Sequence, residues 1–308
     1  MTLAVLCPGQ GAQHPALFDF VDQFPESARV LAAAADALGD DPRGWLTQGD
    51  AIYRNATAQP LITIAQLAQW TALRTRVPEP AALAGYSVGE LSCYGIGGAL
   101  DADELPRLAR ERADAMDAAA DANPGALIGV HGLTRAALQG LCEATASYIA
   151  IVIAIDTFVV GGSEAALSRV RVHCENAGAK VTELRVGIAS HTPLLAAAAE
   201  AFKRALEGSA LSATSIPIVA GVDAGLVSTR DRAIATLSMQ ISRTIEWAHC
   251  LDALHERGCR VFIELSPGHA LCRMVRARFD DVEARSVDEF RELGNAAQWV
   301  AKKVADRP

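Results

Sequence analysis

The stretch of residues 81–90 sets the strongest limit on how this chain can fold. Residues 81–85 form a short apolar run that predicts a buried strand, and the residues after Glu90 are compatible with a helix. Between them stands Gly85-Tyr86-Ser87-Val88-Gly89, whose small residues allow a sharp turn. Residues 3–7 form a second apolar run that also stops at a glycine-rich turn. Strands that lead through tight turns into helices indicate an α/β architecture.

Helices and strands of the same kind are expected before residue 122 and after residue 187. Apolar residues recur at helical spacing over residues 61–73, and a further helix is expected over about 102–120. Asp101 and Glu104 at its start resemble a capping box. Pro193 suits the first turn of a later helix. Two more strands are expected at 217–222 and 260–265, with a helix rich in Trp247, Leu251 and Leu254 between them.

The middle of the chain has a different rhythm, which begins after Asn123-Pro124-Gly125. Strands are expected at 126–131, 148–155, 157–160 and 180–186, with helices at 135–144 and 164–176. The order βαββαβ is the ferredoxin-like pattern. We therefore expect an α/β body made of residues 1–121 and 188–308, interrupted by a small α+β subdomain at 122–187.

Composition excludes several classes of function. The formal net charge is −8, and the 28 basic residues are scattered rather than gathered into a stripe, which argues against a nucleic-acid partner. The seven cysteines lie far apart and form no CxxC, which argues against a disulfide framework and a metal site. No apolar run approaches the roughly 18 residues of a membrane helix, and no basic leader precedes residues 3–7. We expect a cytoplasmic protein.

The motif around Ser87 fits the G-x-S-x-G nucleophile elbow, in which a serine hydroxyl is presented at a helix N-terminus. The alternative is a glycine turn with a capping serine. A nucleophilic serine needs a base, and His191 stands between a predicted strand and a predicted helix, where its side chain could project over a sheet edge. Most histidines, however, merely satisfy local hydrogen bonds.

Arg112 is the most informative single residue. It lies on the apolar face of the 102–120 helix, seven residues after Leu105. A guanidinium there requires a partner. In a structural role, an internal acidic residue pairs with it, or the side chain reaches past its neighbours to water. In a functional role, the guanidinium binds a substrate carboxylate through two parallel hydrogen bonds.

The turn after the first strand, Pro8-Gly9-Gln10-Gly11-Ala12-Gln13, lacks the pattern of a phosphate-binding or dinucleotide-binding loop. One of its backbone amides could instead complete an oxyanion hole with the amide of Val88. The alternative is a turn without a role in the site, for which the same sequence would be expected.

Taken together, these motifs resemble the malonyl-CoA:acyl carrier protein transacylases over nearly the whole chain. The features that carry the resemblance follow in order: PGQGAQ at 8–13, GYSVGE at 85–90, Arg112, SH at 190–191, and Gln240 followed by ELSPG at 264–268. The resemblance implies an α/β-hydrolase-like body with a ferredoxin-like insertion. It also implies that the active site lies in the cleft between the two parts.

By the same resemblance, Ser87 is the acylated nucleophile and His191 its base, and the main-chain carbonyl of Gln240 orients the histidine. Arg112 holds the malonyl carboxylate, and the amides of Gln10 and Val88 form the oxyanion hole. The reaction implied is ping-pong transfer of malonyl from malonyl-CoA to the thiol of an acyl carrier protein. No metal or tightly bound cofactor is needed.

The sequence departs from the family at two places. Tyr86 replaces the usual histidine before the serine, and with the short start of the chain it resembles the epsilon subunit of malonate decarboxylase. We therefore expect malonate decarboxylase rather than fatty-acid synthesis as the setting. The decarboxylase assignment implies a carrier subunit with a phosphoribosyl-dephospho-CoA arm, and other decarboxylase subunits as partners, whereas fatty-acid synthesis implies a phosphopantetheine arm. Residues 153–158 lack the family's Asn and Gln, which removes polar contacts to the thioester from that side. Val88 fits malonyl-selective members, whereas Ser190 does not separate malonyl from methylmalonyl.

Two other hypotheses stay open at this point. A serine hydrolase would use the same elbow with water as acceptor, although Arg112 on an apolar face argues against a general esterase. A scaffold that binds carrier proteins would retain the fold with a disused site.

Overall fold

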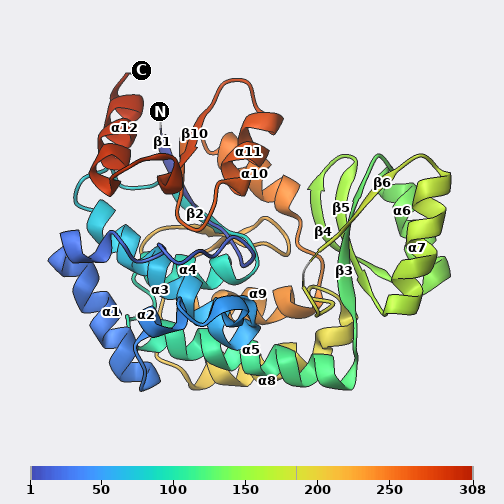
Figure 1. Cartoon of the computed structure of the whole chain (residues 1–308). Helices are drawn as coiled ribbons and strands as arrows, with labels where there is room; N and C mark the ends of the chain where they lie inside the picture. Colours follow the sequence, from blue (N-terminus) through green and yellow to red (C-terminus); the bar gives the residue numbers. More distant parts are fainter. Residues whose placement is uncertain (1, 185, 307–308) are drawn as a thin grey trace.

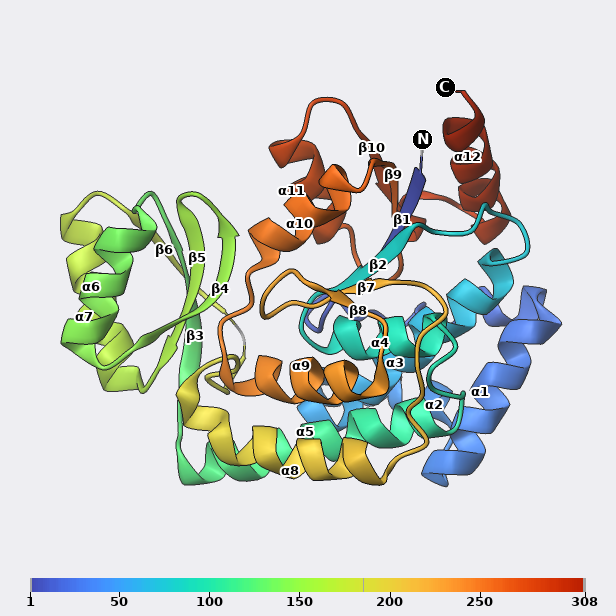
Figure 2. The same cartoon turned by 180° about the vertical axis from the view of Figure 1, so that it is seen from behind.

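The computed structural model describes residues 2–184 and 186–306, and they form two β-sheets with helices packed against them (Figure 1). The larger sheet belongs to the body, and the smaller one forms a separate lobe at one side of it, which the reverse view also shows (Figure 2). None of the helices in the described ranges is both long and apolar enough to span a bilayer.

The body sheet has the strand order β10-β9-β1-β2-β7-β8. Neighbouring strands from β10 to β7 are parallel, and β8 is antiparallel to β7. The strands are β1 (Thr2–Cys7), β2 (Ala82–Gly85), β7 (Ile218–Val219), β8 (Leu226–Val227), β9 (Cys259–Glu264) and β10 (Glu283–Ser286).

Both faces of this sheet are buried, because side chains that alternate along a strand enter two different clusters. In β1, Leu3 and Val5 join one cluster, whereas Ala4 and Leu6 join the other. Helices α10 and α11 cover the second face, and other helices of the body cover the first. The helices of the body are α1 (Pro25–Leu38), α2 (Pro42–Trp45), α3 (Asn55–Leu73), α4 (Val88–Ile96), α5 (Glu104–Ala122), α8 (Ala196–Gly208), α9 (Arg230–Ser242), α10 (Trp247–Glu256), α11 (Ala270–Arg278) and α12 (Leu293–Ala305).

The smaller sheet is antiparallel, with the order β4-β5-β3-β6. Its strands are β3 (Ala126–His131), β4 (Tyr148–Ala154), β5 (Thr157–Gly162) and β6 (Lys180–Glu183), and its helices are α6 (Arg135–Thr145) and α7 (Glu164–Asn176). Both helices cover one face, where Ile128, Val160 and Leu138 share a cluster. The other face carries Leu127, Ile151 and Val159, which belong to a cluster of the body.

The two sheets are joined by the segment between α9 and α10. The Ile245 amide donates to the Ala150 carbonyl at 2.9 Å, and the Val152 amide donates to the Ile245 carbonyl at 2.9 Å. Ile245 therefore pairs with the edge of β4 while its side chain is fully buried in the shared cluster.

The predicted fold class is confirmed: the chain combines an α/β body with an inserted α+β unit of ferredoxin-like strand order. The boundaries proposed at 121/122 and 187/188 stay a prediction. Strand ends differ from expectation by a few residues: β7 covers Ile218–Val219 rather than 217–222, and β6 ends at Glu183 rather than at 186. Residue 185 of that predicted strand lies outside the described residues.

The predicted capping box at the start of α5 is wrong. Asp103, not Asp101, is the N-cap, and it makes no side-chain capping bond. Glu104 instead accepts hydrogen bonds from Arg107 and from the Ala210 amide. The reason is tertiary: the carboxylate that could reach back to its own backbone is taken by a loop from another part of the chain. Pro193 does open a helical turn, the 3-10 helix Pro193–Leu195 before α8.

Candidate active site

Ser87 occupies the turn between β2 and α4 in a backbone conformation that side chains rarely adopt, with φ 56° and ψ −121°. The flanking glycines make this turn possible. A Cβ at Gly85 would lie 2.1 Å from the Glu90 nitrogen, and one at Gly89 would lie 2.0 Å from the Cys7 carbonyl oxygen. The Ser87 hydroxyl does not cap α4, so the alternative of a capping serine is wrong.

His191 meets this hydroxyl, with 3.0 Å between its Nε2 and Ser87 Oγ. Its other ring nitrogen, Nδ1, lies 2.5 Å from the Gln240 carbonyl oxygen, and its amide donates to the Ile241 carbonyl at 2.8 Å. A carbonyl only accepts, so Nδ1 carries the proton and Nε2 is free to accept one from serine. Burial lowers the pKa of His191 to about 3, which keeps the imidazole neutral at ordinary pH.

Arg112 is 1% exposed and lies on the buried face of α5, so it does not reach water. Its Nη1 donates to Gln59 Oε1 at 2.7 Å and its Nη2 to Gln240 Oε1 at 3.3 Å. Within the described residues no acidic side chain forms an ion pair with it, because both partners are neutral amides. Burial lowers the pKa of Arg112 to about 10, so it stays positively charged at neutral pH.

The three side chains line one cavity of about 360 Å³. Its body side includes the turn of Gly9 to Gly11, and its far wall comes from the smaller sheet and from residues that follow β6. That wall is mostly aliphatic, with Leu127, Ile151, Val159, Leu184 and Val186 as its apolar side chains. A cationic fork at a buried position, a hydroxyl with a base and an apolar wall thus share one space.

The two residues predicted to form an oxyanion hole lie at this cavity or next to it. Gln10 lines the cavity, and Val88 opens α4, so its amide belongs to the first turn, which has no partner within the helix. The turn before Gln10 lies against the elbow, since a Cβ at Gly9 would be 2.8 Å from the Tyr86 carbonyl oxygen and 3.5 Å from Ser87 Cβ. Their role in holding an oxyanion stays a prediction.

A comparison with protein families matches residues 5–294 to the acyl transferase domain. This chain belongs to that family. It is 28% identical to the malonyl CoA-acyl carrier protein transacylase of Haemophilus influenzae over 96% of this chain and 98% of the relative. The protein of the same name from Escherichia coli strain K12 is also 28% identical, over 93% of this chain and 96% of its own. The crystal structure of FabD from Acinetobacter baumannii has a TM-score of 0.92 at 27% identity and covers 99% of both chains.

In this acyl transferase, the departures from the family pattern have structural counterparts. Tyr86 lines the cavity and packs edge-on against Trp247, with 5.3 Å between ring centroids. The stretch 153–158 forms a tight hairpin, with only Ile155 and Asp156 between β4 and β5. The strands beside it supply Ile151 and Val159 to the cavity wall. The expected lack of polar contacts from residues 153–158 stays a prediction, and Glu183 of β6 also lines the cavity.

Sequence reasoning missed three buried side chains that surround Arg112. Gln59 lies just outside the predicted 61–73 helix, whereas α3 begins at Asn55. The sequence motifs point to the main-chain carbonyl of Gln240 but not to its side chain, and to Glu90 only as part of GYSVGE. All three are at most 1% exposed. A polar residue in an otherwise apolar run is the signal that could have found them.

Metal ligands do not gather anywhere in residues 2–184 and 186–306: no group of three or more His, Cys, Asp or Glu side chains has the arrangement to hold an ion. All seven cysteines are buried, free thiols.

Proposed function

We propose that this protein transfers malonyl groups from malonyl-CoA to the thiol of an acyl carrier protein through a malonyl-serine intermediate. The observation that carries this proposal is the buried Arg112, free of any acidic ion-pair partner among the described residues, in the cavity that also holds Ser87 and His191. A carboxylate is the substrate group that such a guanidinium binds best. The names of the two curated relatives support the same substrate and carrier.

In the first half-reaction, Ser87 is the nucleophile and His191 is the base. His191 Nε2 takes the proton of Ser87 Oγ while that oxygen attacks the thioester carbonyl. Amides of Gln10 and Val88 stabilise the oxyanion, and Arg112 holds the carboxylate at the other end of the acyl group. The carbon–sulfur bond then breaks, and the proton on His191 passes to the leaving CoA sulfur. In the second half-reaction a carrier thiol attacks the ester, with His191 again as base.

Malonate decarboxylase is the alternative setting for this chemistry. Tyr86 before the serine is the feature that suggested its epsilon subunit, and that assignment stays a prediction. The curated relatives bear the transacylase name, which favours the carrier of fatty-acid synthesis with its phosphopantetheine arm. Transfer to a phosphopantetheine carrier that is faster than transfer to one bearing phosphoribosyl-dephospho-CoA supports our choice; the reverse order supports the decarboxylase.

Replacement of the nucleophile tests the proposal directly. After incubation with malonyl-CoA, intact-protein mass spectrometry should show one malonyl adduct on the unmodified chain and none on Ser87→Ala. Ser92→Ala is the matched control, since Ser92 lies in the same helix α4 but is buried away from the cavity lining. An adduct that persists on Ser87→Ala moves the nucleophile elsewhere.

Two further assays test the remaining hypotheses. Release of free malonate that is as fast without carrier as with it favours a hydrolase. Failure of a fluorophosphonate to label Ser87 in the folded protein favours a scaffold with a disused site.

A further inference from the structure

A row of three buried side chains leads from Arg112 away from the cavity. Arg112 donates to Gln240 Oε1, and Gln240 Nε2 donates in turn to Glu90 Oε2 at 3.3 Å. Glu90 is fully buried in α4 and does not line the cavity. The row therefore connects a cation that faces the substrate with a carboxyl group that does not.

The amide of Gln240 can point in only one direction in this row. Its oxygen faces the guanidinium, which only donates, and its nitrogen faces the Glu90 carboxyl and the Ser87 carbonyl, 3.2 Å away. A flipped amide would set donor against donor at Arg112 and acceptor against acceptor at Ser87. The Gln240 amide is therefore hydrogen-bonded to Arg112 at one end and to Glu90 at the other, so the charge state of each neighbour affects the other through it.

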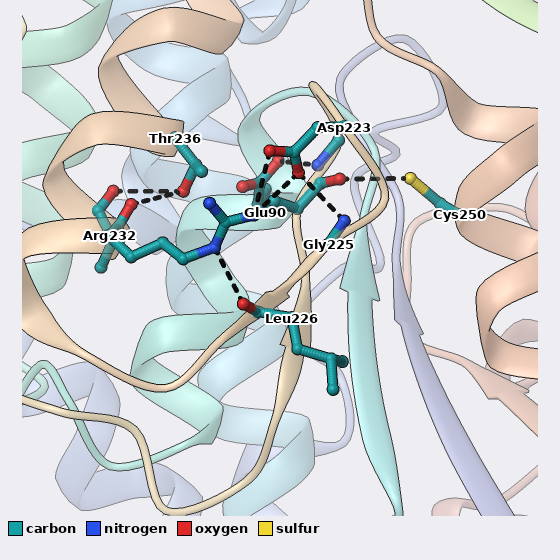
Figure 3. A network of polar contacts seen from close by, with 10 residues as sticks. Glu90, Asp223, Gly225, Leu226, Arg232, Thr236 and Cys250 are labelled. Atoms are coloured by element: carbon teal, nitrogen blue, oxygen red, sulfur yellow. Dashed lines mark hydrogen bonds and ion pairs between the residues drawn. The ribbon is translucent and has the colours of Figure 1, made fainter. Parts of the chain in front are cut away.

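Glu90 is poised between its two protonation states. Its Oε2 accepts from the Gly221 amide at 3.0 Å, but Oε1 is buried without a hydrogen-bond partner in the described part of the chain. An ionised carboxylate with a dry, unpaired oxygen is expensive. Burial raises the pKa of Glu90 to about 8, and the positive charge of Arg112 opposes that rise. Figure 3 shows Glu90 in a polar network beside the Asp223 turn, with Arg232 on one side and Cys250 on the other.

We propose that Glu90 is a positioning residue that acts through Gln240 on Arg112. When Glu90 is ionised, its carboxylate balances the guanidinium of the empty cavity, and it takes up one proton from water when a substrate carboxylate binds Arg112. This inference rests on the proposed function, because it requires a substrate that carries a free carboxylate. Its physical reason is that the substrate's negative charge cancels the charge that keeps Glu90 ionised.

The sign of the pH dependence follows from this exchange. A second negative charge near a carboxyl favours its protonated form, so substrate binding raises the pKa of Glu90 and binding weakens as pH rises above about 8. Below that range Glu90 holds its proton in both states, and binding is independent of this group. The charged or titratable groups that act on Glu90 or adjoin it are Arg112 from α5, Asp223 from the turn before β8, Arg232 from α9, Cys93 and Tyr94 from α4, and Cys250 from α10.

Several of these groups do not compete in this range. Burial raises the pKa of Cys93, Tyr94 and Cys250 well above its usual value. His191 contacts the Gln240 carbonyl, and burial lowers the pKa of His191 to about 3. Glu90 is therefore the group expected to exchange a proton near pH 8.

Proton uptake can be measured by titration calorimetry of malonyl-CoA into Ser87→Ala, which cannot be acylated, in buffers of different ionisation enthalpy. Near pH 8 we expect uptake of about half a proton, since Glu90 is then about half ionised in the free protein. Acetyl-CoA is the matched ligand: it has the same CoA phosphates and no acyl carboxylate, so its binding should take up less. In Ser87→Ala with Glu90→Gln, which keeps an amide oxygen for Gly221, the excess uptake should vanish.

Steady-state kinetics give a second readout. With Ser87 intact, KM for malonyl-CoA should rise toward tenfold per pH unit above about pH 8, and Glu90→Gln should flatten that rise without a matching change in kcat. A rise of the same size in Glu90→Gln overturns the inference. Equal proton uptake with malonyl-CoA and acetyl-CoA also overturns it, even if Glu90→Gln does not fold. Malonyl-CoA that neither binds nor acylates the unmodified protein contradicts the proposed function instead.

Discussion

At the scale of single residues, the decisive feature is a cation placed where water cannot reach it. Arg112 is held by Gln59 and Gln240, two amides that fix its direction without cancelling its charge. A carboxylate partner from the chain itself would have done both. The site thus leaves the guanidinium without a direct carboxylate contact, with Glu90 one side chain further away.

Replacement of Arg112 by Ala should therefore damage malonyl transfer far more than acetyl transfer. We expect malonyl transfer to lose about 2–5 kcal/mol of transition-state stabilisation, as for one partner of a desolvated charge pair. The measurement is kcat/KM for both acyl-CoA substrates. Arg107→Ala, at a half-exposed position of the same helix, should change neither. Equal losses with the two substrates would refute the assigned role.

At the scale of elements, the turn between β2 and α4 is built by close backbone contact. The start of α4 lies against the end of β1, so that there is no room for a Cβ at Gly89. This contact brings the Pro8 to Gly11 turn beside Ser87. The two glycines of the motif therefore shape the elbow and also set its distance from the neighbouring strand.

We expect Gly89→Ala to destabilise the protein by about 3 kcal/mol or more, because its Cβ would meet the Cys7 carbonyl. Gly140→Ala is the matched control: Gly140 lies at an exposed position of α6, and a Cβ there meets nothing within 4 Å. That variant should gain about 0.5–1 kcal/mol. Denaturant unfolding of the two variants measures both changes, and a Gly89→Ala protein as stable as the unmodified one contradicts the close contact.

At the scale of the whole molecule, the two sheets share one apolar cluster. Ile151 and Val159 of the smaller sheet pack with Ile245 and with β-strand residues of the body. The cavity lies at this junction, with its nucleophile on one sheet and its aliphatic wall on the other. The relative placement of the sheets therefore determines the shape of the acyl pocket.

Apolar packing, rather than the surface ion pair, should hold the junction together. Ile245→Ala removes a fully buried side chain and should lower the free energy of unfolding by about 2–5 kcal/mol. Arg135→Ala breaks the two hydrogen bonds to Glu246, of 2.9 and 2.6 Å, but Arg135 is half exposed, so we expect less than about 1 kcal/mol. Equilibrium unfolding tests the order, and a larger loss in Arg135→Ala would reverse the conclusion.

Local pattern was sufficient for much of the fold. The apolar run at residues 3–7, the βαββαβ order after Pro124 and the glycines around Ser87 are patterns among neighbouring residues, so the sequence alone predicts the structure they form. The predicted capping box at Asp101 is wrong because the Glu104 carboxylate is bound by Arg107 and by the distant Ala210 amide. The sequence does not point to Gln59 for a similar reason, since Gln59 has a role only through its contact with Arg112, 53 residues further along the chain.

The sequence by itself determined the α/β class, the inserted α+β unit, and the kinds of side chain available for chemistry. Only the tertiary structure decided which of them meet: it brought His191 to Ser87 from 104 residues away, and it gave Arg112 two amides instead of a carboxylate. The physical reason is the distance along the chain over which each kind of interaction acts. Hydrophobic periodicity and turn chemistry act between neighbours in the chain, whereas the partners of a buried charge are set by the packing of whole elements.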